Sequence, residues 1–227
     1  MPVRKIPIKS KSLSGLFSSI KNGRQVAFES ALERDFIVLQ EFSPEVARYE
    51  EQPLHIPIQK PDGRVGKYTP DFLVWYHDPG RKTALVEIKY ESQLREQASE
   101  LAPAFEAANR HAAENGLEFQ VVTDLPIRIP LLKNAKFLLP FRNHPPPSLL
   151  VGQVMQAVAT GRSLIVAELV KTVAVKTNAE PAEVIPCIWF LVATFRLHVE
   201  LTQPITMKSM ASIPSKELAN ALGASHD

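Results

Sequence analysis

The 227-residue sequence predicts an α/β domain with a mixed sheet, followed by a small and mostly helical domain. The first observation is the order of patterns over residues 28–125: one amphipathic helix, three strands, a long helix and a further strand. The second is the run at 140–147, whose three consecutive prolines are typical of an extended spacer. The third is the set of helical patterns after that spacer.

The first helix and the strands of the α/β domain each have a separate signal. Apolar residues recur at helical spacing from Phe28 and stop near Ser43-Pro44, which predicts one amphipathic helix. Alternating or short apolar runs predict four strands, at 54–58, 68–76, 83–90 and 119–123.

Turn and breaker residues separate these elements. Pro61-Asp62-Gly63 and His77-Asp78-Pro79-Gly80 are turn signals between the first three strands. Residues 91–115 predict a long helix that is bent at Pro103 and ended by Gly116. The resulting order of elements favours a mixed sheet.

The ends of the chain differ from this core. The first 25 or so residues show no sustained periodicity, and we expect an extended basic arm over residues 1–27. After the spacer, helical patterns cover 149–160, 163–176 and 181–195, and Arg196–Lys208 alternates weakly around Pro204, like a short hairpin. Three helices followed by a hairpin is the order of a winged-helix module. The predicted domains are therefore 28–139 and 148–227, joined by the 140–147 linker.

Composition excludes several classes of protein. Apolar residues make up 45% of the chain and charged residues 22%, which is close to a globular average and excludes wholesale disorder. The single cysteine, Cys187, allows no intrachain disulfide and no cysteine zinc cluster, and its apolar neighbours predict a buried side chain. No apolar run reaches the roughly 18 residues of a membrane helix, and the basic N-terminus lacks the features of a signal peptide. We therefore expect a soluble protein of the cytosol.

The net charge of +2 is unevenly distributed. Residues 1–27 carry +6, residues 28–147 carry −4, and residues 148–227 carry no net charge. The basic arm is either a weak DNA contact or a solvated tail, and its charged residues are Arg4, Lys5, Lys9, Lys11, Lys21 and Arg24. A protein with so little net positive charge would need a partner to help hold DNA.

The strongest chemical signal combines Pro70-Asp71 with Glu87-Ile88-Lys89. Side chains alternate across a strand, so Glu87 and Lys89 lie on one face and Ile88 on the other. A short hairpin brings Asp71 onto the neighbouring strand, near Glu87. Two converging carboxylates favour a hard divalent cation, Mg²⁺ or Mn²⁺, and Lys89 could orient water or stabilise charge on a phosphate. The pattern indicates metal-assisted phosphodiester hydrolysis.

The helix that precedes these strands supplies further carboxylates. Glu29 and Glu33 are four residues apart and share one helical face, so either could provide a third ligand. The competing interpretation is an exposed strand face with an ordinary Glu–Lys pair, worth only about 0.2–1 kcal/mol. Gln97, on the helix after the lysine strand, could help to position phosphate, although a solvated helix face explains it equally well.

Residues 28–125 resemble the TnsA endonuclease subunit of heteromeric cut-and-paste transposases, a member of the PD-(D/E)XK nuclease superfamily. Five ordered blocks carry the resemblance: Glu29-Ser30-Ala31-Leu32-Glu33-Arg34-Asp35-Phe36, Tyr49-Glu50-Glu51-Gln52-Pro53-Leu54, Tyr68-Thr69-Pro70-Asp71-Phe72-Leu73-Val74, Leu85-Val86-Glu87-Ile88-Lys89 and Phe119-Gln120-Val121-Val122-Thr123-Asp124. The resemblance implies a restriction-endonuclease-like core. The order of a nuclease domain and a small C-terminal domain also matches.

The resemblance also implies roles for single residues. The helical catalytic glutamate falls on Glu33, in preference to the auxiliary Glu29, the aspartate falls on Asp71, and the motif lysine falls on Lys89. Glu87 departs from at least one family member, which has Gln there, but Glu is a better metal ligand. The backbone carbonyl of Ile88 would complete the metal sphere.

The implied function is cleavage of the 5′ strand at transposon ends, with a separate TnsB-like recombinase cutting and joining the 3′ ends. In such systems the C-terminal region contacts a TnsC-like AAA+ regulator and the partner transposase. One alternative is a stand-alone restriction or repair nuclease of the same superfamily. Another is a non-catalytic scaffold that docks a recombinase to its regulator. The sequence does not distinguish one metal ion from two.

Overall fold

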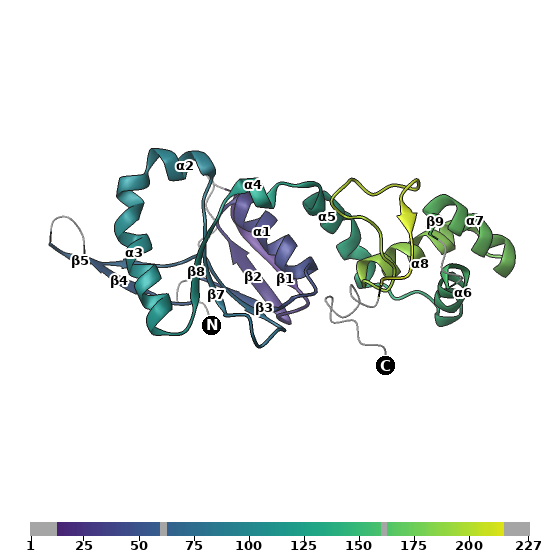
Figure 1. Cartoon of the computed structure of the whole chain (residues 1–227), viewed down its shortest axis with the longest axis horizontal. Coiled ribbons are helices and arrows are strands. Elements are labelled where there is room, and N and C mark those ends of the chain that lie inside the picture. The colour runs from purple at the N-terminus through teal and green to yellow at the C-terminus, as the bar shows by residue number, and fades with distance from the viewer. Residues whose placement is uncertain (1–12, 60–62, 160–162, 216–227) are drawn as a thin grey trace. The chain divides into compact units, whose positions relative to one another are not determined.

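The computed structural model describes residues 13–59, 63–159 and 163–215 (Figure 1). The chain divides into two compact units, residues 1–128 and residues 129–227. This boundary precedes the predicted linker at 140–147, because helix α5 (Pro130–Arg142) packs against α8 (Pro181–Ala193) in the second unit. The proline run therefore connects two helices of one unit.

A four-stranded mixed sheet forms the centre of the first unit, as the sequence predicts. Its strand order is β3-β6-β7-β8, in which β3–β6 and β6–β7 are antiparallel and β7–β8 is parallel. The parallel pair requires a long crossover, which α2 (Glu91–Glu96) and α3 (Ala98–Glu114) provide. The strands are β3 (Val46–Glu51), β6 (Phe72–Tyr76), β7 (Ala84–Ile88) and β8 (Glu118–Val122).

The sheet differs from the predicted one at its antiparallel edge. Strand β3 has no counterpart among the predicted strands, because its sequence Val-Ala-Arg-Tyr-Glu-Glu lacks an apolar alternation. The segments predicted as sheet strands at 54–58 and 68–76 instead contribute to β4 (Ile56–Gln59) and β5 (Val65–Tyr68), which form a separate antiparallel hairpin. Only the part from Phe72 onward joins the central sheet, because Pro70 cannot donate a ladder hydrogen bond.

The crossover helix is interrupted at Gln97, whereas the sequence predicts a bend at Pro103. Gln97 has φ −114° and ψ 19°, so it ends α2 and begins α3. Pro103 lies inside α3, six residues after that break. Gly116 follows α3 with φ +69°, a left-handed conformation that glycine adopts without a Cβ clash. The predicted end of the helix is therefore correct, and the break at Gln97 is an additional feature that the sequence pattern does not predict.

The N-terminal segment is folded where an extended arm was expected. Strands β1 (Gly15–Ser19) and β2 (Arg24–Phe28) form an antiparallel hairpin, whose turn includes Gly23 at φ +61°. The hairpin contacts α1 (Ala31–Phe42), and β2 also contacts β3 (Figure 1). The apolar side chains that this packing buries are few, so the sequence pattern did not reveal it.

A buried carboxylate connects the hairpin to the core. Glu41 on α1 is 4% exposed and accepts hydrogen bonds from Ser19 Oγ (2.7 Å) and Tyr49 Oη (2.7 Å). It also accepts bonds from the backbone N–H groups of Ile20 (3.0 Å) and Lys21 (3.1 Å). Four donors satisfy this buried charge, which fixes the hairpin, α1 and β3 relative to one another.

Helices dominate the second unit. Helix α8 contacts α5, α6 (Ser148–Val158) and α7 (Val166–Thr177), and it buries Cys187 as predicted. The predicted hairpin at 196–208 is absent from the described residues. Instead, β9 (Leu164–Ile165) pairs with β10 (Met210–Ala211), and His198 forms an isolated bridge with Ser212. Within the ranges that the structure describes, no helix is long and apolar enough to cross a bilayer.

The Glu41 cluster generates a stability prediction. Tyr49→Phe removes one hydrogen bond to a buried carboxylate and is expected to lower the free energy of unfolding by about 1.5–3 kcal/mol. Urea denaturation of Tyr49→Phe and of a control variant, each compared with wild type, measures the change in the free energy of unfolding. Tyr90→Phe is the control, because its hydroxyl accepts a bond from the exposed Arg128. Equal losses in the two variants would contradict the role given to Glu41.

Candidate active site

Asp71 and Glu87 lie at the adjoining ends of two antiparallel strands. The register pairs Phe72 with Val86, so Asp71 precedes β6 beside Glu87 near the end of β7. The backbone N–H of Ile88 donates to Asp71 Oδ2 at 2.7 Å. The Asp71 carboxylate therefore points toward β7. The hairpin geometry predicted from sequence therefore brings the two carboxylates together.

Glu87 is 4% exposed and both of its carboxylate oxygens have partners. Tyr68 Oη donates to Oε2 at 2.7 Å, and Lys89 Nζ donates to Oε1. Lys89 Nζ also contacts the carbonyl oxygen of Ile88 at 3.3 Å, the carbonyl that the sequence analysis assigned to the metal sphere. A buried carboxylate with two donors of this kind is a positioned group, not part of a solvated strand face.

Glu33 comes from the first turn of α1. Ser30 is the N-cap, since its Oγ accepts from Glu33 N (3.0 Å) and donates to Glu33 Oε1 (2.9 Å). The backbone N–H of Glu29 donates to Glu33 Oε2 at 2.8 Å. These contacts resemble a capping box and hold the Glu33 carboxylate at the helix N-terminus, where the dipole favours negative charge.

These side chains act on one another electrostatically, although only Glu87 is fully buried and Glu33, Asp71 and Lys89 are half-buried. Burial, and then the charges of Glu87 and Glu33, raise the pKa of Asp71 well above its ordinary value. Burial also raises the pKa of Glu33, with a further contribution from Glu29. Burial alone would lower the pKa of Lys89, but Glu87 and Asp71 raise it, so the ammonium group stays charged at neutral pH. The site therefore combines crowded carboxylates with one compensating cation.

The other predicted site residues have different positions. Glu29 lies beside Glu33 and accepts a bond from Gln52 Nε2 at 3.3 Å, whereas Gln97 is exposed at the junction of α2 and α3. Arg24 forms a two-point ion pair with the buried Glu51, at 2.6 and 2.8 Å. Lys21 donates to the carbonyl oxygens of Ser43 and Val46, so the fold itself uses both hairpin cations. Arg4, Lys5, Lys9 and Lys11 lie outside the described residues.

The described residues contain no preformed group of three His, Cys, Asp or Glu side chains that could hold a metal ion. Protein donors occupy the carboxylate oxygens instead: Ser30 and the Glu29 N–H at Glu33, Ile88 N–H at Asp71, and Tyr68 and Lys89 at Glu87. The donor set nevertheless fits a hard divalent cation, because it consists of carboxylate oxygens whose mutual repulsion a cation would relieve. Binding would replace some of these contacts.

Three residues that contact the site carry no assigned role in the sequence analysis: Tyr68, Ser30 and Gln52. Ser30 could have been identified, because Ser followed three residues later by Glu is a capping-box signature. Tyr68 and Gln52 both fall within the blocks of resemblance, but nothing in their spacing indicates a side-chain contact with a carboxylate. Their contacts depend on the separate β4–β5 hairpin and on the end of β3.

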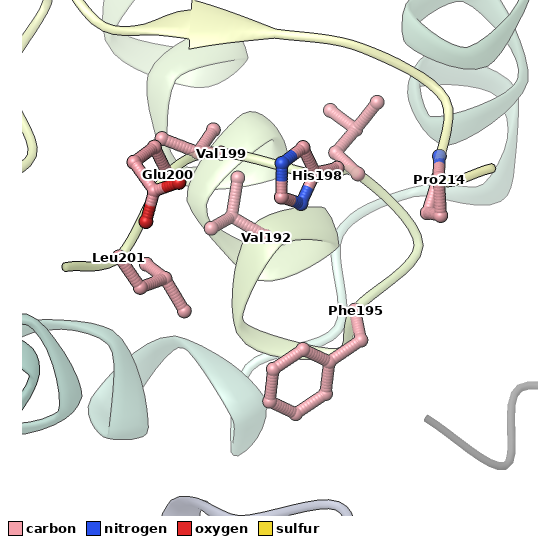
Figure 2. A pocket seen from close by; sticks show the side chains of 8 residues that line it. Val192, Phe195, His198, Val199, Glu200, Leu201 and Pro214 are labelled. Carbon is pink, nitrogen blue, oxygen red and sulfur yellow. The ribbon is translucent and has the colours of Figure 1, made fainter. Parts of the chain in front are cut away.

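The second unit has a pocket of a different character. Figure 2 shows residues that line it: the apolar Val192, Phe195, Val199, Leu201 and Pro214, together with His198 and Glu200. Glu200 accepts bonds from the backbone N–H (2.8 Å) and the hydroxyl (2.7 Å) of Thr202. The lining is mainly apolar and contains one carboxylate, that of Glu200, so it differs in chemistry from the carboxylate cluster of the first unit.

The raised pKa of Asp71 predicts a pH-dependent gain in stability when its charge is removed. In the folded state the pKa lies above the unfolded value, so the ionised form destabilises the fold as pH rises through that pKa. Without divalent cations, Asp71→Asn is therefore expected to raise the Tm at pH 8 and to match wild type near pH 4. In a chain of this size, a stabilisation of about 1 kcal/mol raises the Tm by roughly 2–4 °C.

Thermal unfolding at several pH values, in buffer with a chelator, measures this difference. Asp78→Asn is the control, because Asp78 is an exposed turn residue that accepts only a local bond from Gly80 N–H. A Tm difference for Asp71→Asn that does not change with pH would show that the crowded carboxylates impose no ionisation penalty.

Comparison with known proteins identifies the domain that carries this site. Residues 43–124 match the family model described as TnsA-like endonuclease N terminal, of the Tn7 type. The matched segment contains Asp71, Glu87 and Lys89 and begins after Glu33. A search of curated proteins finds no match to the chain. The segment that forms the central sheet of the first unit, with its paired Asp71 and Glu87, is therefore similar to the N-terminal domain of TnsA-like endonucleases.

Proposed function

We propose that this chain is the endonuclease subunit of a heteromeric transposase and hydrolyses the 5′, non-transferred strand at transposon ends. The observation that supports this most directly is the joining of Asp71, Glu87 and Lys89 in one buried cluster of the TnsA-like domain. Glu33 adds a carboxylate from the preceding helix. A recombinase would cut the other strand. Cleavage of both strands would allow excision and cut-and-paste movement of the element.

The proposed cofactor is Mg²⁺ or Mn²⁺, held by the carboxylates of Glu33, Asp71 and Glu87 together with the Ile88 carbonyl. When bound, such a cation polarises a phosphodiester and lowers the pKa of water for attack. Lys89 contributes a fixed positive charge, which its neighbours keep protonated, and it would stabilise the negative charge that develops on the phosphate. Tyr68 and Ser30 hold Glu87 and Glu33 in place while this occurs.

DNA binding in this proposal depends on a partner. The whole chain carries a net charge of +2, and two of its six N-terminal cations, Lys21 and Arg24, already bind the fold. A TnsB-like recombinase bound at the transposon end would supply the missing affinity and would place the 5′ strand beside the carboxylates. We therefore expect little cleavage of naked DNA by the isolated subunit.

The second unit is proposed to be a winged-helix-like module for protein partners. Its order of α6, β9, α7, α8, the His198 bridge and β10 supports that interpretation, since β10 pairs with β9 between the first two helices and Ser212 pairs with His198 after the third. Residues 148–227 have no net charge, which favours docking to a recombinase or to a TnsC-like AAA+ regulator over DNA binding. Such an assembly would act in the cytosol.

The central prediction is a partner-dependent nick that requires the carboxylate cluster. With Mg²⁺ and the cognate recombinase, the wild type should nick the 5′ strand of a labelled transposon end. Asp71→Asn and Lys89→Met should each lower the rate by at least about 100-fold, because each removes a charge at the reacting phosphate. Strand-specific product analysis on denaturing gels measures both.

Two outcomes would contradict this proposal. Efficient cleavage of naked DNA without a recombinase would assign the chain to stand-alone nucleases. Stable binding of the recombinase without any cleavage by wild type would leave a scaffold role.

The choice between the two helical glutamates gives a further prediction. Glu33→Gln should lower the nicking rate by at least about 100-fold, because it removes a charge that Ser30 and the Glu29 N–H hold beside Asp71. Glu29→Gln should lower the rate far less, because its carboxylate contacts the cluster through Gln52. The same strand-specific assay measures both variants, and a larger loss for Glu29→Gln would reverse the assignment.

A further inference from the structure

Gln52 occupies an unusual position directly after β3. Its φ is +42°, in the left-handed region that residues with a Cβ rarely adopt, and its side chain is buried at 5% exposure. Residues held in such conformations cluster at functional sites, where the surrounding contacts maintain them. Gln52 therefore requires an explanation beyond the packing of a loop.

The contacts of Gln52 link the two segments that carry Glu33 and Asp71. Its backbone N–H donates to the carbonyl oxygen of Asp71 at 2.8 Å. Its side-chain Nε2 donates to Glu29 Oε2 at 3.3 Å, and the Glu29 N–H in turn donates to Glu33 Oε2 at 2.8 Å. One residue thus connects the start of β6 to the start of α1.

The other end of the Gln52 amide is a buried acceptor, Oε1. Gln52 Oε1 makes no hydrogen bond among the described residues. The carboxylate of Glu29 fixes the amide orientation, because an oxygen in place of Nε2 would face another acceptor. A buried carbonyl oxygen without a donor is costly, so its retention beside a carboxylate cluster indicates a ligand that donates hydrogen bonds.

We propose that Gln52 is a positioning residue for the divalent cation: it clamps the Glu29–Glu33 segment to Asp71, and its Oε1 accepts a hydrogen bond from the cation's hydration shell. This inference rests on the proposed function of the site. Mg²⁺ dehydrates reluctantly and keeps several waters when protein carboxylates bind it. Those waters donate hydrogen bonds, and a neutral amide oxygen accepts one without adding a further negative charge to a crowded site.

The test uses the full chain and the variant Gln52→Met. Methionine has nearly the same length and the same strain at positive φ, but it offers neither the donor to Glu29 nor the acceptor Oε1. Mn²⁺ binding in the absence of DNA, measured by calorimetric titration, is expected to weaken by about 10-fold or more, as for other residues that orient metal ligands. The Mg²⁺ concentration for half-maximal nicking should rise by a similar factor, with recovery of the rate at saturating cation.

Gln153→Met is the matched control. Gln153 is the other glutamine in the described residues with a buried Oε1 that lacks a donor, and it lies on α6 in the second unit. Its substitution should leave the Mn²⁺ affinity unchanged. An equal loss of affinity in both variants would show a general effect of replacing buried amides, and would overturn the role of Gln52.

Asp71→Asn separates this inference from the function on which it rests. If Asp71→Asn loses Mn²⁺ binding while Gln52→Met retains wild-type affinity, the positioning role is wrong and the cation site stands. If Asp71→Asn itself retains wild-type affinity, the cation site is wrong, and both proposals fail. Weaker binding in Gln52→Met with an unchanged Tm is the result that supports the inference.

Discussion

The ion pair between Lys89 and Glu87 is the interaction on which the candidate site depends. The charges of Glu87 and Glu33 act on Asp71 near the end of the sheet, and burial raises the pKa of both Asp71 and Glu33. Lys89 supplies the nearest positive charge, bonded to Glu87 Oε1 and 3.3 Å from the Ile88 carbonyl. Without that charge the folded state would hold uncompensated anions in its interior, which is strongly destabilising. A divalent cation would reduce the electrostatic repulsion among these carboxylates.

Rigid contacts outside the cluster keep the carboxylates crowded. The β6–β7 register sets Asp71 against Glu87, the Ser30 cap sets Glu33, and Gln52 connects the two groups. The Glu41 network also fixes separate elements relative to one another, because its hydrogen bonds join the N-terminal hairpin to α1 and β3. The Glu41 network and the candidate site therefore both bury charged groups of the first unit. In one case the protein satisfies the charge, and in the other it leaves a site that favours an added cation.

The sequence predicted the parts of the molecule that follow from local periodicity. Strand alternation and turn residues were enough to place Asp71 beside Glu87, and the helical spacing of α1 brought Glu33 within reach. The N-terminal hairpin and β3 were missed, since their stability comes from Glu41 and from the Arg24–Glu51 pair, which are long-range polar contacts. Tyr68 and Gln52 were missed as site residues for the same reason. Periodicity reports which side chains are buried by apolar packing, and it contains no signal for a buried charge whose partners lie 20 or more residues away.

The strained backbone at Gln52 is costly for the stability of the fold, but it places a side chain at the candidate site. A glycine there would adopt the positive φ without a steric cost, but it would remove the amide that bonds Glu29. An asparagine tolerates the conformation better than glutamine, yet its side chain is one methylene shorter and would not span the same distance. The chain thus retains a residue that is unfavourable for its backbone conformation and whose buried Oε1 has no donor in the part of the chain that the structure describes. Both costs fall on the segment that joins Glu33 to Asp71, which is where a catalytic site gains most from fixed geometry.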